Sequence, residues 1–60
     1  MSNQDDVDML RRLAHLTEDD PVSCVYWSNN ADALERGKRI PNFGAFTAYA
    51  RSVIRNFEGN

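Results

Sequence analysis

The sequence has few residues that could cross-link the chain or hold a metal ion. Its 60 residues include one cysteine, Cys24, and one histidine, His15. A lone cysteine excludes a disulfide within the chain, and the pair falls short of the four ligands that a structural zinc site normally takes. The sequence therefore predicts no metal and no cofactor, so a core of this size needs another source of stability.

Long apolar runs and targeting signals are also missing. No stretch approaches the ~20 consecutive apolar residues that span a bilayer. Residues 1–8 are acidic, whereas a signal peptide opens with a basic segment followed by an apolar run. A single cysteine fits a reducing compartment. We therefore expect a cytoplasmic protein that makes no membrane contact.

The chain lacks recognisable catalytic motifs. Its three glycines are too scattered for a phosphate-binding loop. The acidic residues 18–20 lack the alternation and the glycine of a calcium loop, and a helix cap beside solvated acids explains them better. A nucleophile pair of Cys24 and His15 is a distant alternative, because so short a chain can hardly build a substrate pocket as well. We expect that the protein is not an enzyme.

The composition is that of a small globular protein, with 42% hydrophobic residues. A chain of this length forms one domain, which we place at residues 1–60, and buries only ~60% of the surface that its unfolded form exposes. Small domains commonly gain stability from disulfides, metals or a partner subunit. With the first two excluded, the sequence favours a homodimer.

Hydrophobic periodicity predicts an all-α fold, a small domain of three helices. The helices are expected at residues 4–16, 21–36 and 43–57. Ser2 or Asn3 is a candidate cap for the first helix. Asp5 and Asp6 lie in its first turn, where the helix dipole favours negative charge.

The dipeptide Asp20-Pro21 is the clearest local signal, because Asp is a preferred N-cap and Pro is favoured at the first helical position. Gly37 fits the left-handed position that ends a helix. Residues 22–27 are rich in β-branched and aromatic side chains, which leaves a short strand as the alternative. We prefer a helix, since a single strand has nothing to pair with.

The third helix has the strongest amphipathic pattern. Pro41 discourages a helix at Ile40, and Asn42 is expected to cap the helix, with Gly59 beyond its end. Six apolar residues form its inner stripe: Phe43, Phe46, Ala50, Val53, Ile54 and Phe57. The outward residues are expected to be Thr47, Arg51, Ser52, Arg55 and Asn56.

The second helix carries two apolar stripes, more than a domain of this size can cover. One consists of Val22, Val25, Tyr26 and Ala33, and the other of Cys24, Trp27, Ala31 and Leu34. Either Trp27 simply closes the small core, or one stripe is an interface. Trp, Tyr and Arg are the residues most often found as binding hot spots.

Charge is unevenly distributed along the chain. Residues 1–21 carry six acids against two arginines, and residues 22–60 carry five basic residues against three acids. Alongside the simpler interpretation of an ordinary solvated surface, this suggests a basic face that meets an acidic partner. The residues expected to contact a partner are Tyr26, Trp27, Leu34, Arg36, Arg39, Arg51 and Arg55.

The expected function is that of a non-enzymatic regulator or inhibitor that binds a protein. In type it is similar to the compact proteins that phages and mobile elements encode. The alternative is a small DNA-binding regulator of the helix-turn-helix kind, since Ala33 and Gly37 have the alanine-to-glycine spacing of that motif. Pro41, the acidic balance of the domain and the few base-reading side chains at the start of the third helix count against DNA.

Overall fold

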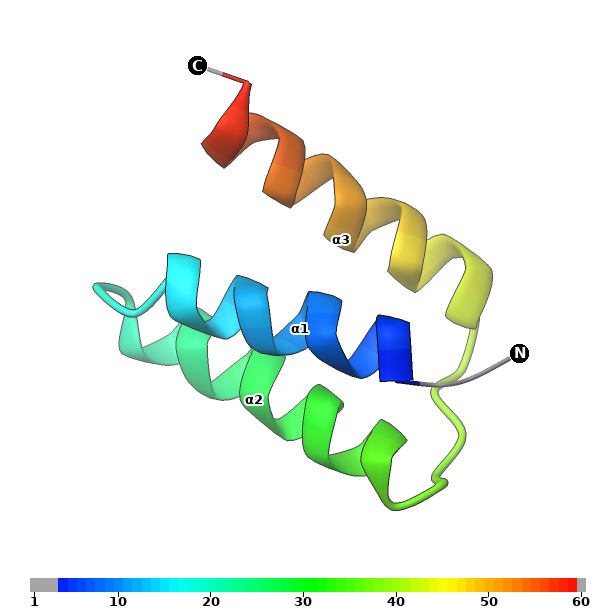
Figure 1. Cartoon of the computed structure of the whole chain (residues 1–60). Coiled ribbons are helices and arrows are strands. Elements are labelled where there is room, and N and C mark those ends of the chain that lie inside the picture. The colour runs from blue at the N-terminus through cyan, green and yellow to red at the C-terminus, as the bar shows by residue number, and fades with distance from the viewer. Residues whose placement is uncertain (1–3, 60) are drawn as a thin grey trace.

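The computed structural model of the chain describes residues 4–59, which form three helices and no strand (Figure 1). Helix α1 spans Gln4–Leu16, α2 spans Pro21–Glu35 and α3 spans Phe43–Glu58. The all-α prediction is confirmed, and each helix ends within one residue of its expected bound. The expected cap at Ser2 or Asn3 lies outside the described residues.

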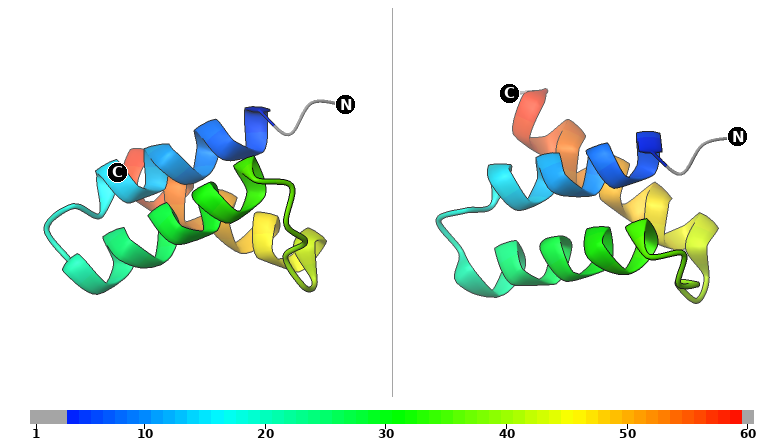
Figure 2. Two further views of the ribbon diagram at one scale, coloured as in Figure 1. Left: turned by 90° about the horizontal axis from the view of Figure 1, so that it is seen from below. Right: turned by 60° about the horizontal axis from the view of Figure 1, so that its bottom comes forward.

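Helix α1 lies between the other two (Figure 1). Helix α2 runs antiparallel beside it, and α3 crosses the α1–α2 pair at an angle (Figure 2). Within the described part of the chain, eight buried hydrophobic residues form the core: Val7, Leu10, Leu13, Ala14, Trp27, Ala31, Leu34 and Ala50. The core therefore lies mostly between α1 and α2, and α3 closes it from one side.

The turn between α1 and α2 is held by side-chain hydrogen bonds to the backbone. The hydroxyl of Thr17 donates to the carbonyl of Leu13 at 2.7 Å. The Asp20 carboxylate accepts from the backbone N–H of Val22 at 3.2 Å and from the hydroxyl of Ser23 at 2.9 Å. Asp20 is therefore the N-cap of α2, with Pro21 in the first turn. The prediction for this dipeptide is confirmed, and residues 22–27 are helical rather than extended.

The connector between α2 and α3 contains two left-handed residues. Gly37 has φ 81°, as expected for the residue that ends α2. Asn42 has φ 53° and ψ 46° and stands at the N-cap position of α3, but its side chain makes no capping hydrogen bond. The predicted side-chain cap is therefore wrong. A capping side chain needs a β-region backbone to reach back over the first turn, and Asn42 turns the chain instead.

Two residues of α3 differ from the predicted pattern: Phe57, expected on the inner stripe, is 51% exposed, and Thr47 was expected to point outwards. It is only 7% exposed, next to Ala50 on the buried side of α3. Its hydroxyl donates to the carbonyl of Gly44 at 3.0 Å. This hydrogen bond satisfies the hydroxyl within its own helix, so a small polar residue occupies a core position at little cost.

Candidate functional site

The two apolar stripes of α2 have different environments. Trp27, Ala31 and Leu34 are buried, and Cys24 packs partly buried against them. The other stripe remains on the surface, where Val22 is 79% exposed.

The exposed side of α2 continues along the whole helix. Val25 is 55% and Tyr26 47% exposed, and Asn29 and Arg36 are exposed on the same side at helical spacing. We call this surface the outer face of α2. It is defined by Val22, Val25, Tyr26, Asn29 and Arg36.

Trp27 is the centre of an aromatic cluster that joins α2 to α3. Its ring centroid lies 4.9 Å from that of Tyr26, 5.7 Å from that of Phe46 and 5.8 Å from that of Tyr49. Trp27 itself is 3% exposed, whereas Tyr49 is 58% exposed. The two tyrosines therefore cover the indole and also present their own outer sides to solvent, an arrangement typical of aromatic anchors.

The structure separates the predicted contact residues on α2. Trp27 and Leu34 belong to the core of the monomer and offer a partner almost no surface. Of the two interpretations of Trp27, closure of the core is the one that fits its burial. Tyr26 stays on the surface and is joined by Tyr49, which the sequence analysis missed. The sequence did indicate Tyr49, because it lies three residues after Phe46, at the edge of the inner stripe of the third helix.

Ion pairs connect the two halves of the chain. Arg11 on α1 donates to Asp32 at 3.1 Å and to Glu35 at 2.6 Å on α2. The hydrogen bond to Glu35, and then that to Asp32, raises the pKa of Arg11 from its ordinary value, so its charge is secure. Arg12 on α1 pairs with Glu58 on α3. Arg11 and Arg12 thus form ion pairs with all three acidic residues of residues 22–60.

As a result, the basic residues of the second half have no ion-pair partner within residues 4–59. They are Arg36, Lys38, Arg39, Arg51 and Arg55. All five are exposed. An exposed cation without an internal partner keeps its charge available to another molecule.

These cations do not form a single patch. Arg51, Arg55 and Glu58 follow one another at helical spacing on α3, and Glu58 pairs with Arg12 of α1. Arg51 and Arg55 therefore lie on the flank of α3 that faces α1. Tyr49 lies on the opposite flank, against α2. The predicted site is thus divided: the aromatic residues share a surface with Arg36, and the two α3 arginines do not.

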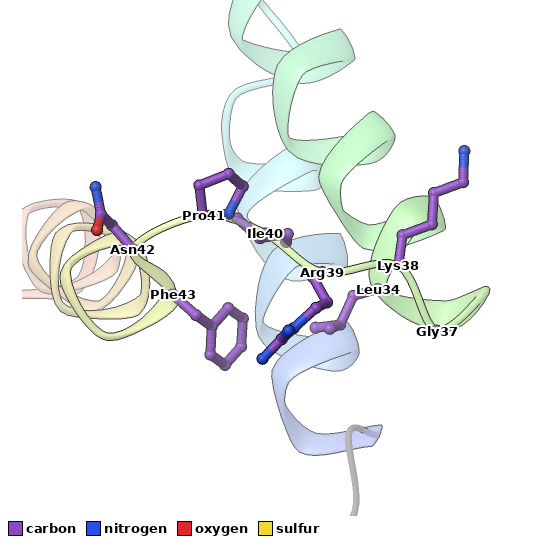
Figure 3. A pocket seen from close by; sticks show the side chains of 8 residues that line it. All are labelled: Leu34, Gly37, Lys38, Arg39, Ile40, Pro41, Asn42 and Phe43. Atoms are coloured by element: carbon purple, nitrogen blue, oxygen red, sulfur yellow. The ribbon is translucent and has the colours of Figure 1, made fainter.

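A hollow of about 650 Å³ lies at the connector (Figure 3). The guanidinium of Arg39 and the ring of Phe43 point into it beside Leu34, whereas Lys38 points away (Figure 3). Leu34 therefore belongs to the core and also lines this open hollow. Trp27, the other predicted contact residue in the core, does not line it. The lining of the hollow combines the cation of Arg39 with four apolar side chains, and so suits an acidic or aromatic side chain of another protein. The four are Leu34, Ile40, Pro41 and Phe43.

The residues weighed as a nucleophile pair have separate surroundings. His15 is exposed, and its Nδ1 lies 3.3 Å from the carboxylate of Glu18. Cys24 packs against the core of the α1–α2 pair. Within the described part of the chain, no three His, Cys, Asp or Glu side chains are grouped so that they could hold a metal ion.

No family model, curated protein or solved structure matches this chain. The helices of residues 4–59 are also too short or too polar to cross a membrane. Inferences about function therefore rest on the surface described above.

Proposed function

We propose that this protein is a cytoplasmic, non-enzymatic regulator or inhibitor that acts by binding another protein. The observation that carries the proposal is the exposed apolar surface of α2 and α3, made by Val22, Val25, Tyr26 and Tyr49. Two valines and two tyrosines exposed on adjoining helices form the kind of apolar surface that marks a site of interaction with another protein. Tyrosine is, in addition, one of the residues that dominate binding energy.

Charge supports a partner with acidic groups beside an apolar segment. Arg36 lies on the outer face of α2, and Arg39 points into the hollow at the connector. Neither has an ion-pair partner within residues 4–59. Unpaired cations at the rim of an apolar surface steer an acidic partner and select against a basic one.

Self-association is part of the proposal. The core holds only eight buried hydrophobic residues, and the second stripe of α2 stays exposed in the monomer. A second copy that covers this stripe would remove apolar surface from water at about 25 cal/mol for each Å² buried. A homodimer therefore supplies the stability that disulfides and metals do not.

The DNA-binding alternative is less well supported. A helix-turn-helix joins its two helices by three or four residues, whereas residues 36–42 separate α2 from α3. The five unpaired cations are also split between the connector and the far flank of α3. If the protein nevertheless binds random duplex DNA at physiological salt, and that binding weakens steeply as salt rises, DNA replaces protein as the proposed partner.

The test of protein binding is affinity capture from the native host, read by mass spectrometry with three baits. The first bait is the wild-type chain, and the second carries Val22→Glu and Tyr26→Glu. The third carries Arg55→Glu, which makes the same change of net charge at an exposed position on the flank of α3 that faces α1, away from Tyr49. Circular dichroism first verifies that all three baits are equally helical.

We expect one protein to be retained by the wild-type bait and by the Arg55→Glu bait, and to be lost from the Val22→Glu, Tyr26→Glu bait. A protein retained equally by all three baits would refute the assignment to this surface. The absence of any specifically captured protein would refute the proposed function.

A further inference from the structure

The outer face of α2 has an acidic end and a basic end. Three acids precede the helix, and we call Glu18, Asp19 and Asp20 the acidic end. Three basic residues follow its last turn, and we call Arg36, Lys38 and Arg39 the basic end. All six residues are exposed. The apolar part of the face, with Val22, Val25 and Tyr26, lies between these two ends.

The positions along the face are symmetric about Asn29. Val22 lies seven residues before it and Arg36 seven residues after it, so the three residues repeat at one heptad on the exposed side of the helix. At 1.5 Å per residue, this heptad pair extends about 21 Å. Asp19 and Arg39 are equally far from Asn29, at ten residues each.

We propose that the outer face of α2 packs antiparallel against the same face of a second copy of this chain, with Asn29 at the two-fold axis. The inference rests on the proposed self-association and gives it a geometry. Two copies related in this way place the acidic end of each beside the basic end of the other. Asp19 of each copy then lies near the basic end of the other, at both ends of the interface.

Charge decides between the two possible orientations. A parallel pair would place acids beside acids and cations beside cations, and like charges in register across an interface are destabilising. The antiparallel pair converts both repulsions into attractions. The structure leaves Asp19 and the three cations of the basic end without an ion-pair partner in residues 4–59, whereas Glu18 pairs with His15 and Asp20 caps α2.

The same arrangement gives Val25 an apolar partner, whereas Val22 would lie beside Arg36 and Tyr26 beside Asp32 of the other copy. Val25 of each copy lies four residues before Asn29 and would pack beside Ala33 of the other, four residues after it. Asn29 itself would meet its counterpart at the axis. A single polar residue at the centre of an apolar seam fixes register and orientation at a cost in affinity. The dimer is therefore expected to be specific in orientation and moderate in affinity.

The first experiment is sedimentation equilibrium of the full chain with two charge-reversed variants. One carries Glu18→Lys and Asp19→Lys, and the other carries Lys38→Glu and Arg39→Glu. Each variant alone should self-associate at least tenfold more weakly than the wild type, because each would bring like charges together at both ends. An equimolar mixture of the two should recover a dimer of near wild-type affinity, because opposite charges then meet again.

The matched control carries Arg51→Glu and Arg55→Glu, which makes the same change of charge on the flank of α3 that faces α1. It should dimerise within about twofold of the wild type. The wild-type dimer should also weaken as salt is added, because screening removes the attraction between its ends.

The second experiment reads the orientation directly by disulfide cross-linking in a Cys24→Ala background. Asn29→Cys should form a covalent dimer under mild oxidation, and Val22→Cys should not, since its counterpart would be about 21 Å away along the pair. A parallel dimer would cross-link at both positions.

The results separate the geometry from the broader proposal. Cross-linking at Val22→Cys as efficient as at Asn29→Cys, or charge-reversed variants that dimerise like the wild type, would overturn the antiparallel interface while leaving a dimer. A chain that remains monomeric at all concentrations would overturn both the interface and the proposed self-association. Affinity capture tests a different point, namely whether a protein other than a second copy of this chain binds.

Discussion

The indole ring of Trp27 on α2 stacks on the phenol ring of Tyr49 on α3, with ring centroids 5.8 Å apart and planes inclined by 26°. Trp27 is 3% exposed and Tyr49 is 58% exposed. One side of the tyrosine therefore covers the core, and its other side faces water. The contact joins a helix that is part of the core to the helix that closes it.

Replacement of the buried Trp27 should lower the free energy of unfolding far more than replacement of Tyr49, which covers it. Trp27→Ala should cost about 3 to 5 kcal/mol, most or all of the stability of a domain this small. Tyr49→Ala should cost about 1 kcal/mol, and Tyr49→Phe should be nearly neutral, because the stacked ring remains. Urea denaturation followed by circular dichroism gives these values. A well-folded Trp27→Ala chain of unchanged stability would contradict the burial of the indole.

The N-cap of α2 should contribute measurably to stability. Asp20→Ala removes the acceptor of the Val22 N–H and of the Ser23 hydroxyl, and should cost about 1 kcal/mol. In a domain of this length, that loss lowers the melting temperature by several degrees. Asp19→Ala, measured at a concentration at which the chain is monomeric, is the matched control, because the neighbouring acid is exposed and makes no capping bond, and it should change stability by less than about 0.5 kcal/mol. Equal effects of the two substitutions would contradict the cap.

Asn42 should behave as a left-handed residue rather than as a cap. Asn42→Gly should be neutral or slightly stabilising, because glycine adopts φ near 53° without strain. Asn42→Thr should cost about 1 kcal/mol or more, because a β-branched side chain is strained in that region. A capping role would predict that threonine is tolerated. Thermal denaturation of the two variants therefore distinguishes the two roles, and a Thr variant as stable as the wild type would refute ours.

Two exposed glycines should respond in opposite directions to the same substitution. Gly37 has φ 81°, and an added methyl group would touch nothing, so the cost of Gly37→Ala is that of the backbone alone, about 1 kcal/mol. Gly44 lies in the first turn of α3, also with open space around it. Gly44→Ala should stabilise the protein, by up to about 1 kcal/mol, through helix propensity. Melting temperatures that shift in the same direction would contradict this assignment.

Local signals determined most of the helix boundaries. Asp20, Pro21 and Gly37 act through backbone geometry within a few residues of themselves, so their roles followed from the sequence. Asn42 looks the same in sequence but turns the chain, because the connector must redirect it towards α3. A residue type that suits both a cap and a left-handed turn does not reveal which one the chain needs.

The environment of the side chains was harder to predict, because it depends on how the helices pack. The pattern of α2 offered two apolar stripes of similar quality, and only the position of α1 and α3 decides that Trp27 goes inside and Val22 stays outside. Thr47 appeared polar and outward, yet its hydroxyl is satisfied by Gly44 within the same turn. The ion pairs from Arg11 to Asp32 and Glu35 join residues far apart in sequence, so no local rule could have predicted them.

Helix α1 and helix α2 lie side by side, whereas α3 crosses them, packs less extensively against α1, and contacts α2 through the aromatic rings around Trp27 (Figure 2). Such unequal attachment implies that the molecule opens in stages. The amide protons of α3 should exchange with solvent through a partial opening that leaves the α1–α2 hairpin intact, and those of α1 beside Leu10 only through complete unfolding. Helix α3, which closes the core, is thus also the helix that detaches first. Its detachment requires less free energy than complete unfolding of the protein.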